Sequence, residues 1–169
     1  LEVERIDHGY TVLDNPALAR RCAERGIVFT VVPTNSYYLR TLPPERWALD
    51  HPIRRMPQAG LLLHPNTDDP PLHRIDPAGC WRMMAEDFGF GLDDLRRFML
   101  NGIVGAFLPE ADKRGLAATF VAEYDRLRAG MEHNAGPPPT PSPPSAPLRA
   151  SPRPARRWPP SMRASSRTW

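Results

Sequence analysis

Two adjacent aspartates, Asp68 and Asp69, are the residues whose type and spacing point most directly to chemistry. They follow a run of leucines in the segment His64-Pro65-Asn66-Thr67-Asp68-Asp69-Pro70, with a proline on each side of the pair. Because neighbouring side chains diverge at a strand end, the two carboxylates can serve different partners. One could bind a cation, and the other could accept a hydrogen bond from a ligand. A polar loop with a helix cap is the alternative, since Asp-Asp-Pro is common in turns.

His8 is the second candidate, because it follows a short apolar-polar alternation and precedes Gly9. A histidine in that place could be a metal ligand, a general base or an electrostatic stabiliser. An ordinary hydrogen-bonded histidine is the alternative. The segment Pro33-Thr34-Asn35-Ser36 has no ionisable group and is expected to be a loop. Zinc takes several His, Cys or carboxylate ligands, and the sequence has no HxH or HExxH motif.

Three short apolar runs must position these residues, and we expect them to be strands over residues 3–7, 27–32 and 61–64. The middle run, IVFTVV, is typical of a strand that is covered on both faces. Strand, polar loop, helix and strand in that order predict a parallel α/β sheet. Chemistry collects at the carboxyl ends of such strands. Each candidate residue follows one of these ends.

Helices are expected between and after the strands. Asn15 as cap, Pro16 at the first position and Gly26 as stop predict the first helix. A helical turn is expected over residues 51–56, and three later helices begin near Pro77, Leu92 and Pro109. The apolar residues at helical spacing are expected to be packing faces: Leu18, Ala19 and Cys22; Trp81, Met84, Ala85 and Phe88; Leu95, Phe98, Met99 and Ile103; Leu116, Phe120, Tyr124 and Leu127.

The composition changes abruptly near Gly136. Residues 134–169 hold six arginines and no acid, which leaves 16 basic and 19 acidic side chains in residues 1–133. We expect this Pro/Arg-rich tail to be disordered, because it cannot bury enough apolar surface. Three alternative explanations of this composition are an interaction tail, a linker and a shifted reading frame. A nucleic-acid partner is not expected, since the basic charge of the chain belongs to the tail alone.

The two cysteines, Cys22 and Cys80, form no CxxC pattern and are expected to be reduced thiols of a cytoplasmic protein. No apolar run reaches the ~18–20 residues that span a bilayer, so no membrane partner is expected. The chain begins with Leu1, and we expect it to be a fragment or a processed product.

The sequence resembles the C-terminal part of the adenosine deaminase family over about residues 1–128. Four stretches match the family's patterns in order, which makes the resemblance far more specific than any one of them. They are Arg5-Ile6-Asp7-His8-Gly9 (R-I-G-H-G), Pro33-Thr34-Asn35-Ser36 (P-T-S-N), Asn66-Thr67-Asp68-Asp69-Pro70 (N-T-D-D-P), and Asn101 with Phe107-Leu108-Pro109-Glu110 and Lys113-Arg114 (N-A…F-L-P-E-E-K-R).

The resemblance implies the α/β class and the C-terminal part of a TIM (β/α)8 barrel. Residues 1–133 would contain its last three strands and C-terminal helices, followed by the tail at 134–169. It also implies hydrolytic deamination of a purine nucleoside, adenosine to inosine and ammonia, by a hydroxide on one bound zinc ion. Asp68 would be a zinc ligand, Asp69 would hydrogen-bond the purine ring, and His8 would position and stabilise the hydroxide.

The chain departs from the family at two positions, because Asp7 stands for the usual glycine and Asn35-Ser36 reverses the usual order. The family's three zinc histidines and its acid/base glutamate lie upstream of the matching region. We therefore expect the chain by itself to be inactive. Adenine and aminodeoxyfutalosine stay open as substrates beside adenosine. A non-catalytic half-barrel that binds RNA or an SH3-type partner through its tail is the alternative function.

Overall fold

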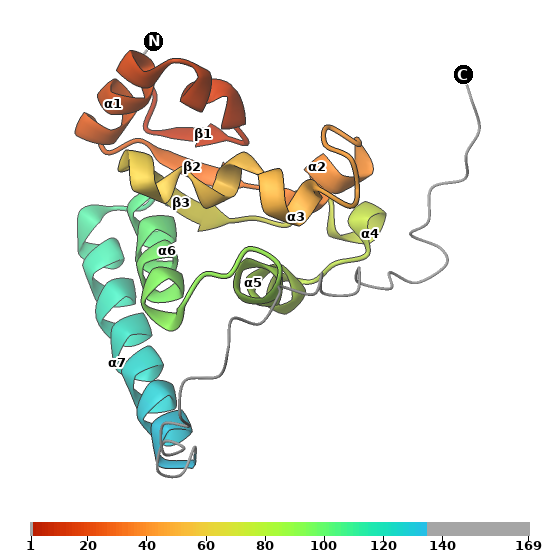
Figure 1. The fold of residues 1–169 in the computed structure, drawn as a ribbon. Helices are drawn as coiled ribbons and strands as arrows, with labels where there is room; N and C mark the ends of the chain where they lie inside the picture. Colours follow the sequence, from red (N-terminus) through yellow and green to blue (C-terminus); the bar gives the residue numbers. More distant parts are fainter. Residues whose placement is uncertain (1, 135–169) are drawn as a thin grey trace, which may run out of the picture. The chain divides into compact units, whose positions relative to one another are not determined.

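The computed structural model describes residues 2–134. The chain divides into two units, Leu1–Glu123 and Tyr124–Trp169, with the boundary inside its last helix. The first unit is built on a three-stranded parallel sheet of β1 (Arg5–Asp7), β2 (Val28–Val31) and β3 (Leu62–Pro65), in the order β1-β2-β3 (Figure 1). The three predicted strands and the parallel α/β class are therefore confirmed.

The central strand β2 forms the core of the sheet. All four of its residues are buried, and Phe29 and Val31 are completely inaccessible. Phe29 pairs with Ile6 of β1 and Leu63 of β3, so the apolar residues of the three strands lie side by side. This burial agrees with the continuous apolar pattern of the strand, which indicated cover on both faces.

A 3-10 helix, η1 (Tyr10–Asp14), and helix α1 (Pro16–Glu24) connect β1 to β2. The side chain of Asn15 caps α1 by accepting a hydrogen bond from the backbone N–H of Leu18 at 3.1 Å. Ala19 and Cys22 face the core as predicted. Leu18 is 45% exposed, so its place on the packing face was predicted wrongly; it stands in the first turn, beside the cap.

The segment between β2 and β3 is more helical than predicted. Pro33-Thr34-Asn35-Ser36 is the start of helix α2 (Pro33–Tyr38), so the predicted loop is wrong. The physical reason is that proline at the first helical position has its backbone angle set for a helix. The chain continues through α3 (Trp47–Asp50) and two 3-10 turns, η2 (Pro52–Arg54) and η3 (Pro57–Ala59). The turn η2 corresponds to the helical turn predicted over residues 51–56, whereas η3 was not predicted.

After β3 come α4 (Pro70–His73), α5 (Pro77–Glu86) and α6 (Leu92–Val104). The predicted starts of α5 and α6 are confirmed, and Asp76 caps α5 by accepting from the N–H of Gly79 at 2.6 Å. Helix α6 approaches the sheet closely, because the side-chain amide of Asn101 donates to the carbonyl oxygen of Leu63 at 2.9 Å. The residue that follows α6 is Gly105, and its lack of a side chain leaves room for the side chain of Val28 at this contact.

Helix α7 (Glu110–Asn134) begins where Pro109-Glu110 predicted a helix. Its predicted packing face is wrong, since Leu116, Phe120 and Leu127 are 38%, 46% and 52% exposed in the described part of the chain. Residues 135–169, almost all of the predicted tail, lie outside the described residues, so the boundary between residues 133 and 134 stays a prediction.

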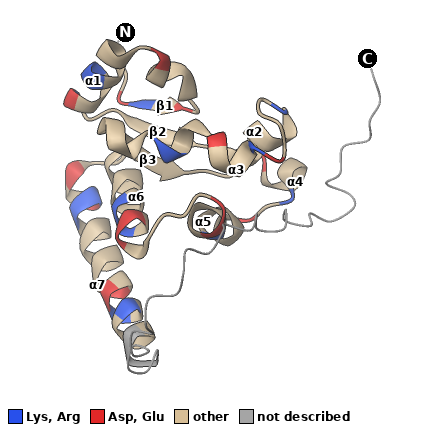
Figure 2. Cartoon of the chain, viewed as in Figure 1, with Lys and Arg blue, Asp and Glu red and all other residues tan. Residues whose placement is uncertain are grey.

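Side chains of both charge signs are interspersed along α1, α6 and α7 (Figure 2). None of the described helices is both long and apolar enough to cross a membrane. Cys22 and Cys80 are both free and buried, as predicted for reduced thiols.

Candidate functional site

His8 and Asp68 meet at the carboxyl edge of the sheet although 60 positions separate them in the chain. His8 follows β1 directly, and Asp68 comes three residues after β3. The Nε2 atom of His8 lies 3.7 Å from Oδ2 of Asp68, and the two side chains are 39% and 34% exposed. A half-exposed imidazole and carboxylate in contact can share a proton or orient a ligand between them.

Both residues have left-handed backbones, with φ of 61° at His8 and 57° at Asp68. Such a conformation in a residue other than glycine costs on the order of 1–3 kcal/mol and is found mainly where function requires it. The backbone of His8 is held by a 2.9 Å hydrogen bond from its N–H to the carbonyl oxygen of Thr30 in the neighbouring strand. The sheet therefore fixes the direction of the His8 side chain.

The carboxylate of Asp68 is oriented by α2. The Nδ2 atom of Asn35 donates to Oδ2 of Asp68 at 3.1 Å, and the Asp68 N–H donates to Oδ1 of Asn66 at 3.0 Å. Asn35 and His8 thus share one oxygen of the carboxylate. The other oxygen makes no hydrogen bond within residues 2–134, so it is available to a ligand or a cation.

Asp69 stands at the cap position of α4, but its side chain makes no capping hydrogen bond. Its carboxylate is exposed and has no hydrogen bond or ion pair in the described part of the chain. A capping role therefore does not account for this residue. The carboxylate stands beside Asp68 and can accept a hydrogen bond from a bound molecule.

A contact between α2 and α4 holds the loop that carries the two aspartates. The ring of Tyr38 stacks on His73 with centroids 5.1 Å apart, and its hydroxyl donates to the His73 carbonyl at 3.2 Å. The buried Nδ1 of His73 lies 3.4 Å from the carbonyl oxygen of Thr67 and 3.5 Å from the hydroxyl of Thr34. Sequence reasoning missed Tyr38 and His73; the only available signal was a histidine four positions after Asp69.

Tyr10 and Cys80 lie beneath the same edge and were not predicted to belong to it. The hydroxyl of Tyr10 accepts a 2.7 Å hydrogen bond from the N–H of Val32, and its ring lies edge-on to His8 at 6.3 Å. Burial raises the pKa of the Tyr10 hydroxyl, and burial raises the pKa of the Cys80 thiol to about 12. Both groups therefore stay neutral and serve as support for the site, with the Cys80 thiol donating to the Asn66 carbonyl at 3.5 Å.

Asp7 departs from the family pattern, and its carboxylate is bonded to neighbouring residues of the sheet. Its carboxylate accepts a hydrogen bond from the hydroxyl of Thr30 and lies 3.3 Å from Nε of Arg5. The extra carboxylate is thus neutralised by an arginine beside it.

The described residues of this chain can supply one ligand of a metal site, not a complete set. Among residues 2–134 no three His, Cys, Asp or Glu side chains come together to hold a metal ion. A catalytic zinc takes three protein ligands and a water. The described residues offer an unbonded carboxylate oxygen, on Asp68, and the Nε2 atom of His8 lies 3.7 Å from the other oxygen of that carboxylate.

A family model described as adenosine deaminase matches residues 1–123. An adenine deaminase from Cupriavidus necator is 33% identical over 127 residues, which cover 75% of this chain and 34% of that protein. The adenosine deaminase of Mus musculus is 29% identical over 124 residues, which cover 73% and 34%. The chain therefore spans about a third of the length of the curated relatives it matches.

Two solved structures have the same arrangement of elements. A zinc-bound amidohydrolase from Burkholderia ambifaria is 56% identical with a TM-score of 0.74, over 78% of this chain and 36% of that one. The adenine deaminase of Arthrobacter aurescens is 27% identical with a TM-score of 0.66, over 73% and 37%. Purine deaminases and a zinc-bound hydrolase are thus the relatives of this chain.

Proposed function

Since this chain belongs to the adenosine deaminase family, we propose that the protein of which it forms part deaminates adenosine by hydrolysis, giving inosine and ammonia. The observation that carries the proposal is the meeting of His8 and Asp68 at 3.7 Å, beside the unpaired carboxylate of Asp69. Adenine is the second candidate substrate, because the proteins from Cupriavidus necator and Arthrobacter aurescens are both adenine deaminases.

The sheet would be the last part of a larger barrel. Three parallel strands joined in sequential order are what the end of a (β/α)8 barrel contains. Three strands cannot close a barrel by themselves. The barrel would be completed by the two thirds of the relatives' length that this chain does not span.

Asp68 would contribute one ligand to a single zinc ion. Its unbonded oxygen is available for this, and Asn35 holds the other oxygen in place at 3.1 Å. In such a site the zinc supplies a water that ionises near neutral pH. Orientation of the carboxylate by a neighbouring amide is the usual support that a ligand needs.

His8 and Asp69 would act on the two sides of the reacting centre. His8 would hold a proton at Nε2, the atom that faces Asp68, and so stabilise the attacking oxygen. Asp69 would accept a hydrogen bond from the purine ring and orient the carbon that bears the amino group. The remaining ligands and the acid/base group would come from outside this chain, so the chain by itself would be inactive.

The proposal is tested by a chimera in which residues 2–134 replace the matching segment of the Burkholderia amidohydrolase. Ammonia release from adenosine and adenine is measured for the chimera and for Asp68→Asn, Asp69→Asn and Asp14→Asn. We expect Asp68→Asn and Asp69→Asn to lower kcat/KM at least a hundredfold. Asp14→Asn, the matched control in η1, should leave it unchanged.

Full activity of Asp68→Asn or Asp69→Asn in the chimera would contradict the assigned roles. A higher kcat/KM on adenine than on adenosine would favour the second substrate. Release of ammonia by the 169-residue chain alone would show that the remaining ligands are not needed. Salt-sensitive RNA binding that is lost when residues 134–169 are deleted would instead favour a non-catalytic role for the tail.

A further inference from the structure

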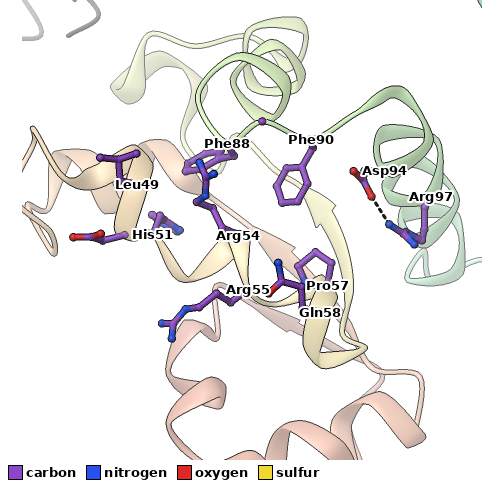
Figure 3. A pocket seen from close by; sticks show the side chains of 12 residues that line it. Leu49, His51, Arg54, Arg55, Pro57, Gln58, Phe88, Phe90, Asp94 and Arg97 are labelled. Carbon is purple, nitrogen blue, oxygen red and sulfur yellow. Dashed lines mark hydrogen bonds and ion pairs between the residues drawn. The ribbon is translucent and has the colours of Figure 1, made fainter. Parts of the chain in front are cut away.

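A second cavity lies away from the aspartates, between the η2–η3 segment and the start of α6. Its volume is about 780 Å³, and its walls include Arg54, Arg55, Phe90 and Arg97 (Figure 3). None of His8, Asp68 and Asp69 lines it. Cavities of roughly 300–1,000 Å³ are the usual size for small ligands, so this one is large enough for an occupant of its own.

Among the charged side chains that line the cavity, the carboxylates already have partners, whereas two of the three arginines have no acidic partner in the described part of the chain. Its two carboxylates are already bonded, since Asp50 receives two 2.7 Å hydrogen bonds from Arg46, and Asp94 pairs with Arg97 and accepts from the N–H of Gly91 at 3.1 Å.

The other two arginines have no acidic partner within the described residues. The guanidinium group of Arg54 makes one hydrogen bond, to the carbonyl oxygen of Ala48 at 3.2 Å, and the guanidinium group of Arg55 makes none within residues 2–134. They are consecutive residues at the end of η2, and Figure 3 draws both on the wall opposite Arg97. A guanidinium group without a carboxylate partner can bind an anion, and it matches the geometry of phosphate well.

The same cavity has an aromatic wall. Phe88, which is 3% exposed, forms part of it, while the ring of Phe90 is half-buried and packs edge-on against Phe98 at 4.9 Å. In Figure 3 the ring of Phe90 lies between Arg54 and Arg97. An aromatic ring fixed by its neighbours offers a planar face on which a flat group of a ligand can stack.

We propose that this cavity binds an aromatic phosphate ester of the nucleoside monophosphate class. Arg54 and Arg55 bind the phosphate, and the base stacks against Phe90. The site shares no lining residue with His8, Asp68 and Asp69, so its occupancy does not require zinc bound at the aspartates.

The test is a titration of the 169-residue chain with adenosine monophosphate, followed by calorimetry and by the backbone amide signals in NMR. We expect saturable binding, with the largest shifts at Gln58, Gly89 and Phe90. Adenosine, which lacks the phosphate, should bind at least tenfold more weakly, and inorganic phosphate should shift the arginine wall without moving Phe90. Absence of saturable shifts at these three amides would overturn the proposal.

Two double variants distinguish binding in the cavity from binding that depends only on the net charge of the chain. Arg54→Gln with Arg55→Gln should raise the Kd at least tenfold, while Arg20→Gln with Arg82→Gln should change it less than twofold. The control removes the same charge from exposed positions on α1 and α5 that do not line the cavity. Equal losses in the two double variants would overturn the proposal, because the binding would then follow net charge.

A third variant leaves both arginines in place. Gln58→Glu adds a carboxylate at an exposed position on the cavity wall, so it should raise the Kd at least threefold without disturbing the Arg54 hydrogen bond. An unchanged Kd for Gln58→Glu would contradict a phosphate in this cavity. Failure of these tests would leave the proposed deaminase function untouched, because the two sites have no residue in common.

Discussion

The burial of His51 makes the stability of the fold depend on pH. This residue is 1% exposed, its ring lies 4.7 Å from that of Tyr10, and its Nδ1 accepts a hydrogen bond from the N–H of Ile53 at 3.1 Å. A nitrogen that accepts from a backbone donor cannot also carry a proton. Burial lowers the pKa of His51 from 6.5 to about 4, so the folded protein keeps this ring neutral.

This pKa predicts how stability depends on pH. Between pH 6.5 and 4 the unfolded chain binds a proton at position 51 and the folded chain does not. The free energy of unfolding should therefore fall as the pH falls, by about 3 kcal/mol between pH 7 and pH 4 from this residue. Urea unfolding at several pH values measures it.

His51→Asn is the control, because asparagine keeps a capping acceptor for Ile53 but does not titrate. The stability difference between the unsubstituted chain and His51→Asn should shrink by about 3 kcal/mol over the same range. A difference that does not change with pH would show that burial does not lower the pKa of His51.

The site residues fall into two groups by how they could be predicted. His8 directly follows one apolar run, Asp68 and Asp69 lie in the loop after another, and parallel strands bring their carboxyl ends to one edge. Tyr38 and His73 could not be predicted, because their stacking depends on how α2 and α4 pack across the chain. Sequence spacing carries no signal for such a contact.

At the scale of elements, the close approach of α6 to the sheet depends on small residues. A Cβ atom at Gly105 would lie 2.9 Å from Cγ1 of Val28, and one at Gly102 would lie 2.3 Å from Nδ1 of His64. Val28 is 1% exposed and has no room to move. The helix rests on β2 and β3 only because these two positions have no side chain.

Gly105→Ala should therefore lower the free energy of unfolding by about 1–3 kcal/mol, as expected for overpacking in a tight core. Gly115→Ala is the matched variant, since nothing lies within 4 Å of a Cβ there in α7. That change should raise the stability by up to about 1 kcal/mol through helix propensity. Urea unfolding of the two variants measures both, and equal effects would contradict the close contact of α6.

The elements themselves were largely predictable, with one instructive error. Apolar runs predicted the strands, caps with prolines predicted the starts of α1 and α5, and Pro109 predicted the start of α7. The polar segment after Pro33 was expected to be a loop, yet Pro33 begins α2. The polar side chains there bind residues that are distant in the sequence, as Asn35 binds Asp68. The composition of the segment carries no information about such partners.

At the scale of the whole molecule, the chain belongs to the adenosine deaminase family. It spans about a third of its curated relatives and presents a carboxylate, an imidazole and a second carboxylate at one edge. Within residues 2–134 no complete metal-binding group exists. We therefore predict that zinc binding needs Asp68 together with residues from outside this chain.

The zinc content of purified protein tests this claim most directly. After dialysis against a weak chelator, the 169-residue chain should retain almost no zinc, and the chimera with the Burkholderia amidohydrolase should retain about one ion per molecule. The chimera with Asp68→Asn should lose that ion, while Asp69→Asn should keep it. Retention of zinc by the Asp68→Asn chimera would contradict the account, because Asp68 would then not be a ligand.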